Sequence, residues 1–246
     1  MINPAGKYVL LNILIAILFL FHSCNSTVED DSGDGTTYSY DFYSGTEGWI
    51  NGFADYPVGE ENFYELSFAH SKLPQYLGNK YGLYISGNNH SDDLFMYIKR
   101  QFTNLKANTS YAVRFNVEIA SDALESIAGI GGSPGASVYL HAGATVEEPE
   151  SIIIHESDLQ DNYYRMNIDK GNQSYGGADS IVLGNIGISD QNPDQPYKLK
   201  ALGNNMAITV STDNTGILWI FIGTDSGFEG VTSIYFSSIK ITLTEQ

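Results

Sequence analysis

Four loops of this 246-residue chain combine large aromatic side chains with amides and carboxylates; they cover residues 48–59, 87–93, 167–177 and 223–230. Sugar recognition uses flat aromatic faces against the C–H side of a pyranose ring. It also uses planar amides, carboxylates or a lysine to bind the hydroxyl groups. The loops therefore predict a site for a glycan or a related polar ligand, with these candidate contacts: Trp49, Asp55, Tyr56, Asn88, Asn89, Asp92, Asp93, Lys170, Asn172, Gln173, Asp225 and Glu229.

The same residue types also have a purely structural explanation. Asn, Asp and Gly are common turn residues, and Trp49 and Tyr56 are large enough to fill the end of a β-sandwich. Loops on a rigid scaffold are nevertheless the usual place for binding residues. We therefore expect at least one of the four loops to form a ligand site.

Carboxylates in these loops also permit a glycan-active hydrolase or lyase. A glycosidase needs two carboxyl groups about 5–10 Å apart across one cleft. A third interpretation is a structural or interaction protein without a small ligand, in which the loops pack against each other. Non-catalytic binding is the first interpretation, and the sequence does not show which of the five carboxylates converge: Asp55, Asp92, Asp93, Asp225 and Glu229.

A nucleophile-elbow pattern occurs at residues 131–135, which read G-G-S-P-G. That motif needs an oxyanion-hole N–H from the residue after the serine, and a helix after it. Pro134 follows Ser133 and has no N–H, and the next residues predict a strand. We therefore exclude a serine hydrolase of this type. The histidines after residue 24 show no metal-ligand spacing and are expected to be structural: His70, His90, His141 and His155.

Calcium is the one metal that the acidic loops suggest. Asp92 with Asp93, and Asp225 with Glu229, supply the carboxylate oxygens that Ca²⁺ prefers. No D-x-D-x-D-G loop is present, so a structural calcium site would have to be assembled from distant segments. No other cofactor is indicated.

Residues 1–23 have the pattern of a cleaved export signal. An apolar run at residues 9–21 is shorter than the about 20 residues of a membrane-spanning helix and leads directly to Cys24, the one cysteine. Ser23 followed by Cys24 resembles a bacterial lipobox, in the looser form of Bacteroidota lipoproteins. The resemblance implies cleavage before Cys24, acylation of that residue and anchoring in the outer membrane. The alternative is an ordinary secretory signal with an incidental cysteine.

Residues 24–37 are predicted to form the acylated cysteine and a solvated, flexible tether. Residues 25–37 contain four acids and one apolar residue, too little apolar surface to order the segment. An acidic run at this place also resembles the signal that directs Bacteroidota lipoproteins to the cell surface. A linker that is merely acidic is the alternative.

Charge limits the choice of partners. The chain has 29 acidic against 12 basic residues, a net charge of −17, and removal of residues 1–23 takes away only Lys7, which gives −18. An acidic surface without a basic cluster repels phosphate backbones, so nucleic acid is excluded as a partner. A glycan or other polar ligand, a membrane reached through the lipid, and an outer-membrane protein remain as expected partners.

Residues 38–246 predict a single all-β domain. Apolar and polar residues alternate strictly over residues 111–120, as in a strand with one buried face, whereas residues 217–222 are apolar on both faces and predict a central strand. No useful helical period occurs. The expected strands are 37–42, 63–68, 82–86, 94–102, 111–120, 137–142, 163–168, 181–186, 197–201, 207–212, 217–223 and 232–243.

The order of these features resembles jelly-roll sandwiches of the galactose-binding-like class, which is common among carbohydrate-binding modules. The similarity is carried by Phe42 with Gly48-Trp49, the GLYISG segment at 82–87, the turn at 105–111 and an isoleucine-rich last strand. It covers most of residues 38–246. It implies a single antiparallel jelly-roll β-sandwich and, because its motifs are structural, says more about the fold than about the ligand.

Overall fold

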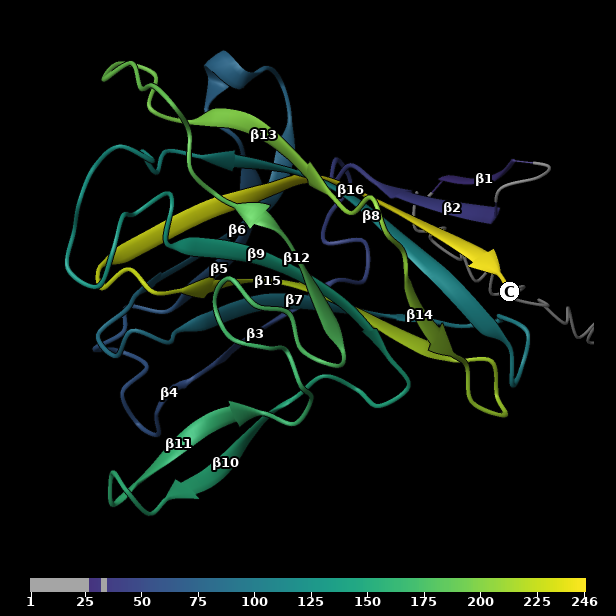
Figure 1. Cartoon of the computed structure of the whole chain (residues 1–246). Helices are drawn as coiled ribbons and strands as arrows, with labels where there is room; N and C mark the ends of the chain where they lie inside the picture. Colours follow the sequence, from purple (N-terminus) through teal and green to yellow (C-terminus); the bar gives the residue numbers. More distant parts are fainter. Residues whose placement is uncertain (1–26, 32–34) are drawn as a thin grey trace, which may run out of the picture.

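The computed structural model describes residues 27–31 and 35–246 (Figure 1). The predicted export signal (1–23) and Cys24 lie outside these residues, and so does part of the predicted tether. The described chain is built from β-strands and one short 3₁₀ helix, η1, Gln75–Leu77. No helix among the described residues has the length and apolar character needed to cross a membrane.

The larger sheet has eight antiparallel strands around the last strand of the chain. It consists of β1 (Thr27–Asp31), β2 (Gly35–Tyr40), β5 (Ser67–Lys72), β6 (Tyr81–Asn88), β8 (Ser110–Ser121), β13 (Lys198–Gly203), β14 (Ile208–Ser211) and β16 (Val231–Glu245). β16 pairs with β8 along one side and with β2 and β6 along the other. The strand expected at 111–120 is therefore β8, in the interior of this sheet.

The second sheet has five antiparallel strands in the order β12 (Ser180–Asn185), β9 (Val138–Thr145), β15 (Leu218–Ser226), β7 (Phe95–Phe102) and β3 (Ile50–Ala54). β15 lies in the middle, paired with β9 and β7. The chain passes back and forth between the two sheets, which is the arrangement of a jelly roll. The predicted all-β antiparallel sandwich is confirmed.

Alternation along the strands of the five-stranded sheet produces two apolar layers. Met96 and Ile98 of β7 point into the main core between the two sheets. Phe95 and Tyr97 point to the opposite face, where they form a second cluster with Ala54 and Phe221. Both faces of this sheet are therefore covered by side chains.

The second cluster is covered by a small three-stranded sheet and the loop after it. This sheet contains β10 (Ser151–Glu156), β11 (Asp161–Met166) and β4 (Tyr56–Pro57), and it lies beside the five-stranded sheet in Figure 1. Met166 and Ile168, at the end of β11 and just beyond it, pack on the cluster. We refer to residues 146–180 as the insertion.

Four strands were not expected from the sequence: β1, β3, β4 and β10. β10 contains three consecutive exposed isoleucines, so it lacks the alternation that identifies a strand. β3 and β4 lie within 48–59, which the sequence predicts as an irregular loop. β1 and the start of β2 lie within the predicted tether, where they pair with each other.

Candidate functional site

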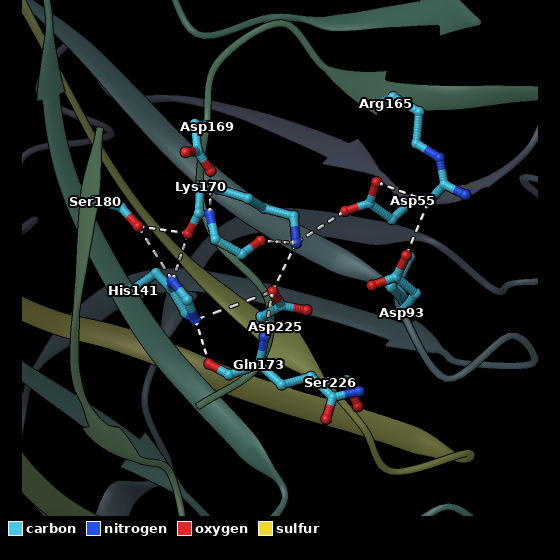
Figure 2. Close-up of polar contacts among 12 residues, drawn as sticks. Asp55, Asp93, His141, Arg165, Asp169, Lys170, Gln173, Ser180, Asp225 and Ser226 are labelled. Carbon is cyan, nitrogen blue, oxygen red and sulfur yellow. Dashed lines mark hydrogen bonds and ion pairs between the residues drawn. The ribbon is translucent and has the colours of Figure 1, made fainter. Parts of the chain in front are cut away.

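A cleft of about 220 Å³ opens where the insertion crosses the five-stranded sheet. Met166 and Ile168 supply its apolar surface, and Figure 2 shows most of its charged side chains converging. Its polar lining comes from Asp55, Asp93, Arg165, Asp169, Lys170 and Asn172.

Asp55 reaches the cleft because the chain turns sharply between β3 and β4. The residue has φ = 64°, a left-handed conformation that is uncommon outside glycine and tolerated best by Asn and Asp. Its backbone N–H donates to the Tyr164 carbonyl of β11 at 2.6 Å. The turn therefore fixes the Asp55 carboxylate between the insertion and the five-stranded sheet.

Lys170, a residue of the insertion, is buried between two carboxylates (Figure 2). Its Nζ lies 2.6 Å from Asp225 Oδ2, 3.1 Å from Asp55 Oδ2 and 5.0 Å from the centre of the Phe95 ring. Asp225, on β15, is 0% exposed, and its Oδ2 also accepts a hydrogen bond from the Gln173 backbone N–H at 3.0 Å. Burial lowers the pKa of Lys170, but the two carboxylates outweigh this effect and raise it overall.

Arg165 lies at the mouth of the same cleft and is held by three carboxylates. Its Nη1 donates to Asp55 Oδ1 at 3.0 Å and to Asp93 Oδ2 at 2.8 Å, and its Nε donates to Glu156 Oε1 at 2.9 Å. The guanidinium also lies over the Tyr163 ring, 4.9 Å from its centre. Charge-assisted hydrogen bonds of this kind fix the orientation of an arginine.

His141 anchors the insertion from below. It lies on β9 without exposed surface, with Nδ1 3.0 Å from the Lys170 carbonyl oxygen and Nε2 2.6 Å from that of Gln173. Burial lowers its pKa, against the opposing effect of the Asp225 carboxylate 4.0 Å away. The buried position of His141 agrees with the structural role expected for it from the sequence.

Burial also changes the acidity of the carboxyl groups around Arg165. Burial, together with the neighbouring Asp55 carboxylate, raises the pKa of Asp93 from 3.8 to about 6, against the lowering effect of Lys170 and Arg165. Burial likewise raises the pKa of Asp55, although Lys170 and Arg165 lower it. Asp93 is thus the cleft carboxyl that titrates in mildly acidic solution.

This titration predicts a pH dependence of stability. Between about pH 4 and pH 6 the folded chain keeps a proton on Asp93 that the unfolded chain has lost, so the free energy of unfolding falls as the pH rises through this window. In Asp93→Asn this fall should be smaller by about 1–2 kcal/mol, an amount discounted for the partly exposed side chain. Urea unfolding of both proteins at the two pH values measures the difference. Equal pH dependences would contradict the assignment.

Six of the predicted contacts come together in this region. Asp55, Asp93, Lys170 and Asn172 line the cleft. Asp225 and Gln173 lie directly beside Lys170 and hold its loop in place. The structure therefore brings at least one residue from each of the four loops to one region, a convergence that the sequence did not show.

Trp49 and Tyr56 require a correction. Trp49 is 1% exposed and packs edge-to-face on Tyr40 with the ring centres 5.6 Å apart. Tyr56 is 5% exposed and packs between Tyr64 and Tyr164. Both rings belong to the main core, so neither presents a face to a ligand, and the structural explanation applies to both.

Asn88 and Asn89 hold their loop instead of facing the cleft. Asn89 is buried, and its Nδ2 donates to the carbonyl oxygens of Ser226 and Phe228. The Asn88 side chain donates to Glu65. These contacts correct the prediction that the two amides bind a ligand.

Asp92 and Glu229 do not line the cleft either. The Asp92 carbonyl accepts a hydrogen bond from the Gln173 side chain, which ties the two loops together. Glu229 lies against the 130–132 loop through its backbone N–H and Ile130. Within the part of the chain that the structure describes, no group of three or more His, Cys, Asp or Glu side chains is arranged to hold a metal ion, so the acids proposed for calcium do not assemble.

The sequence did not identify Arg165, which organises the cleft. It lies in a segment expected only as a strand, and its place opposite Ile152 depends on β10, which was not expected. A usable signal was its charge, because cations are scarce in this acidic chain. Ser133, in the pattern excluded as a nucleophile elbow, lies in a turn where its Oγ donates to the Leu124 and Glu125 carbonyls.

Comparison with known proteins finds solved structures of low similarity to this chain. No family model matches the sequence, and no curated protein matches it. A xylan-binding domain from Paenibacillus barcinonensis has 14% identity and a TM-score of 0.38, over 85% of this chain and 94% of that one. A mannan-recognising carbohydrate-binding module has 11% identity and a TM-score of 0.36, over 90% and 98%.

A third similar structure is the K1 cleaved adhesin domain of Lys-gingipain from Porphyromonas gingivalis W83. It has 10% identity and a TM-score of 0.37, over 85% of this chain and 98% of that one. At these identities and TM-scores, the ligand of the present chain has to be inferred from its own side chains.

Proposed function

We propose that the cleft beside Arg165 binds one unit of a glycan or a related polyhydroxylated ligand, without converting it chemically. The observation that carries this proposal is the fixed guanidinium of Arg165, which Asp55, Asp93 and Glu156 hold at the cleft mouth. A binding group that is already oriented loses little conformational entropy when a ligand arrives. Within residues 27–31 and 35–246, no protein group bonds Arg165 Nη2, so this nitrogen is available as a donor.

The size and charge of the cleft define the class of ligand. Its volume of about 220 Å³ lies below the roughly 300–1,000 Å³ of typical small-molecule sites, so it accommodates a single ring or the end of a chain. The charges of Arg165 and Lys170 are already balanced by carboxylates of the protein. A neutral ligand whose hydroxyls both donate to Asp93 and accept from Asn172 or Arg165 therefore fits better than an anion.

Two contacts of Asp55 favour binding over catalysis. Its Oδ1 faces Arg165 and its Oδ2 faces Lys170, so neither oxygen is free to act as a base or a nucleophile toward a ligand in the cleft. A hydrolase is the second candidate because Asp93, with a pKa of about 6, keeps below that pH a proton that a general acid would donate. Hydrolysis of a glycan that the protein binds, lost in Asp93→Asn, would favour this second candidate.

The proposal includes the cellular location expected from the sequence. We place the domain on a lipid anchor at Cys24, on the outer membrane of a bacterium and exposed to the exterior. The export pattern of residues 1–23 and the acidic segment that follows support this placement. A surface-anchored domain with one small polar cleft would hold a glycan near the cell or near an outer-membrane partner protein.

Asn172→Ala provides the direct test of binding. The side chain of Asn172 is exposed in the cleft, while its backbone forms the turn with Tyr175, which alanine preserves. On a glycan array, the wild-type protein should bind a defined set of glycans. For these, loss of one hydrogen bond should weaken the affinity of Asn172→Ala about three- to tenfold.

Asn205→Ala is the matched control for this experiment. Asn205 is also exposed and lines a different cleft, formed by residues 176–183 and 203–207, so the control should keep wild-type affinity. Equal weakening by both substitutions, or weakening by Asn205→Ala alone, would place the binding site elsewhere. Absence of binding across the array would favour the interpretation as an interaction protein.

A further inference from the structure

The ion pair of Lys170 and Asp225 differs from the carboxylate pairs that the other lysines form among the described residues. Both its side chains are almost completely buried, at 8% and 0% exposed. In the pair formed by Lys99 and Glu148, the N–O distance is similar, 2.7 Å, but the glutamate side chain is 38% exposed. Other lysines pair with carboxylates whose side chains are between 28% and 77% exposed: Lys80, Lys106, Lys198 and Lys200.

A second carboxylate contacts the same amine. Asp55 Oδ2 lies 3.1 Å from Lys170 Nζ, on the side away from Asp225 in Figure 2. A lysine, a buried carboxyl within contact distance and a further carboxyl that can exchange protons with the amine are the groups required to form an amide bond. We propose that Lys170 and Asp225 condense to an intramolecular isopeptide bond between the insertion and β15.

Three physical conditions favour this step. The reacting groups are held together by the fold, because Gln173 and His141 fix the loop that carries Lys170, and such proximity replaces a bimolecular encounter. The site excludes water, so the ion pair has lost its solvation and conversion to neutral groups is less costly than at a surface. Phe95 covers the amine from a further side.

The atoms, protons and electrons of this step balance with the groups present. The Lys170 ammonium gives one proton, relayed by Asp55, to Oδ1 of the Asp225 carboxylate, and the neutral amine attacks Cγ of the resulting carboxyl group. In the tetrahedral intermediate the Gln173 N–H stabilises Oδ2 as the developing oxyanion. Asp225 Oδ1, which has no hydrogen-bond partner among the described residues, leaves as water with two protons from the nitrogen, relayed by Asp55. One C–N bond forms, one C–O bond breaks, and nothing is oxidised or reduced.

The charges of the product are also balanced. Loss of the ammonium and of the Asp225 carboxylate removes one charge of each sign, and the remaining Asp55 carboxylate keeps its ion pair with Arg165. The bond would fasten the insertion to the central strand of the five-stranded sheet. The cleft groups of the proposed binding site, Arg165, Asp93 and Asn172, take no part in the reaction, so the two proposals stand or fall separately.

Mass spectrometry of the full chain, purified in detergent and then denatured, tests the bond. We expect trypsin to leave Lys170 uncut, because an amidated lysine is not cleaved. The peptide of residues 166–198 should then be joined to that of residues 201–240, with the mass of one water molecule missing from their sum. Fragmentation should place the link on Lys170 and Asp225.

Two variants give the control and the mechanism. Lys99→Arg should retain the linked peptide, whereas Lys170→Arg, which keeps the charge, should lack it. Asp55→Asn should slow its formation about 100-fold, the typical contribution of a proton-transferring group. If a variant does not fold, the peptide masses of the wild-type protein alone still test whether the bond is present. Separate wild-type peptides with cleavage after Lys170, or a lost water that maps to any other peptide, would overturn the proposal.

Discussion

Trp49→Ala should destabilise the domain by about 3–5 kcal/mol, the usual cost of truncating a buried tryptophan. Trp49 is among the largest fully buried side chains, and alanine would leave a cavity beside Tyr40 in the main core. Such a loss is a large part of the roughly 5–15 kcal/mol that holds a domain folded. Urea unfolding followed by circular dichroism measures it.

Trp49→Phe separates packing from hydrogen bonding at the same position. Among the described residues, Trp49 Nε1 has no hydrogen-bond partner, so phenylalanine keeps an aromatic ring there and removes an unpaired buried donor. We expect this variant to lose clearly less stability than Trp49→Ala. If Trp49→Ala were as stable as the wild type but lost glycan binding, the assignment of Trp49 to the core would be wrong.

Lys170→Met should also cost about 3–5 kcal/mol, since the buried carboxylates of the variant have no cation, whether the wild-type chain holds the ion pair or the proposed amide. Asp225 would keep only its hydrogen bond from the Gln173 N–H, and Asp55 would keep only Arg165. Burial raises the pKa of Asp55 and Lys170 lowers it, so without Lys170 the folded chain binds a proton at Asp55 more readily. The free energy of unfolding of the variant should therefore rise as the pH is lowered and Asp55 becomes protonated.

A double-mutant cycle identifies the source of this loss. Asp225→Asn removes the stranded charge, so Lys170→Met with Asp225→Asn should lose less than the sum of the two single substitutions, a sign of direct coupling. Thermal and urea unfolding at neutral pH provide the four free energies. Additive losses, or a Lys170→Met loss that does not shrink in acid, would contradict a buried electrostatic role.

The sequence predicted the parts of this fold in which local pattern and burial agree. β8 alternates because one face contacts the core, and β15 is apolar on both faces because the insertion covers the second one. β10 was missed since its three consecutive isoleucines show no period of two. β3 and β4 were missed because the left-handed Asp55 divides a short segment into two strands.

The sequence was sufficient to select many of the residues of the candidate site, but not to predict how they are arranged in space. Asp55, Asp93, Lys170 and Asn172 were selected for their chemistry, and long-range packing brings them together. Trp49 could not be assigned correctly, because an aromatic ring in a glycine-rich segment has the same sequence signature in a core and in a binding loop. Arg165 depends on the β10–β11 hairpin for its position, so its charge was the only local signal for choosing it.

The most direct test of the central claim is a ¹H–¹⁵N NMR titration of the protein with a glycan selected on the array. If the glycan binds in the cleft of Arg165, the largest amide shifts should occur at residues 169–172 and at Asp93. They should saturate together with a single affinity. Shifts centred on residues 176–183 and 203–207, which line the separate cleft, would contradict the proposed site, as would the absence of saturable shifts.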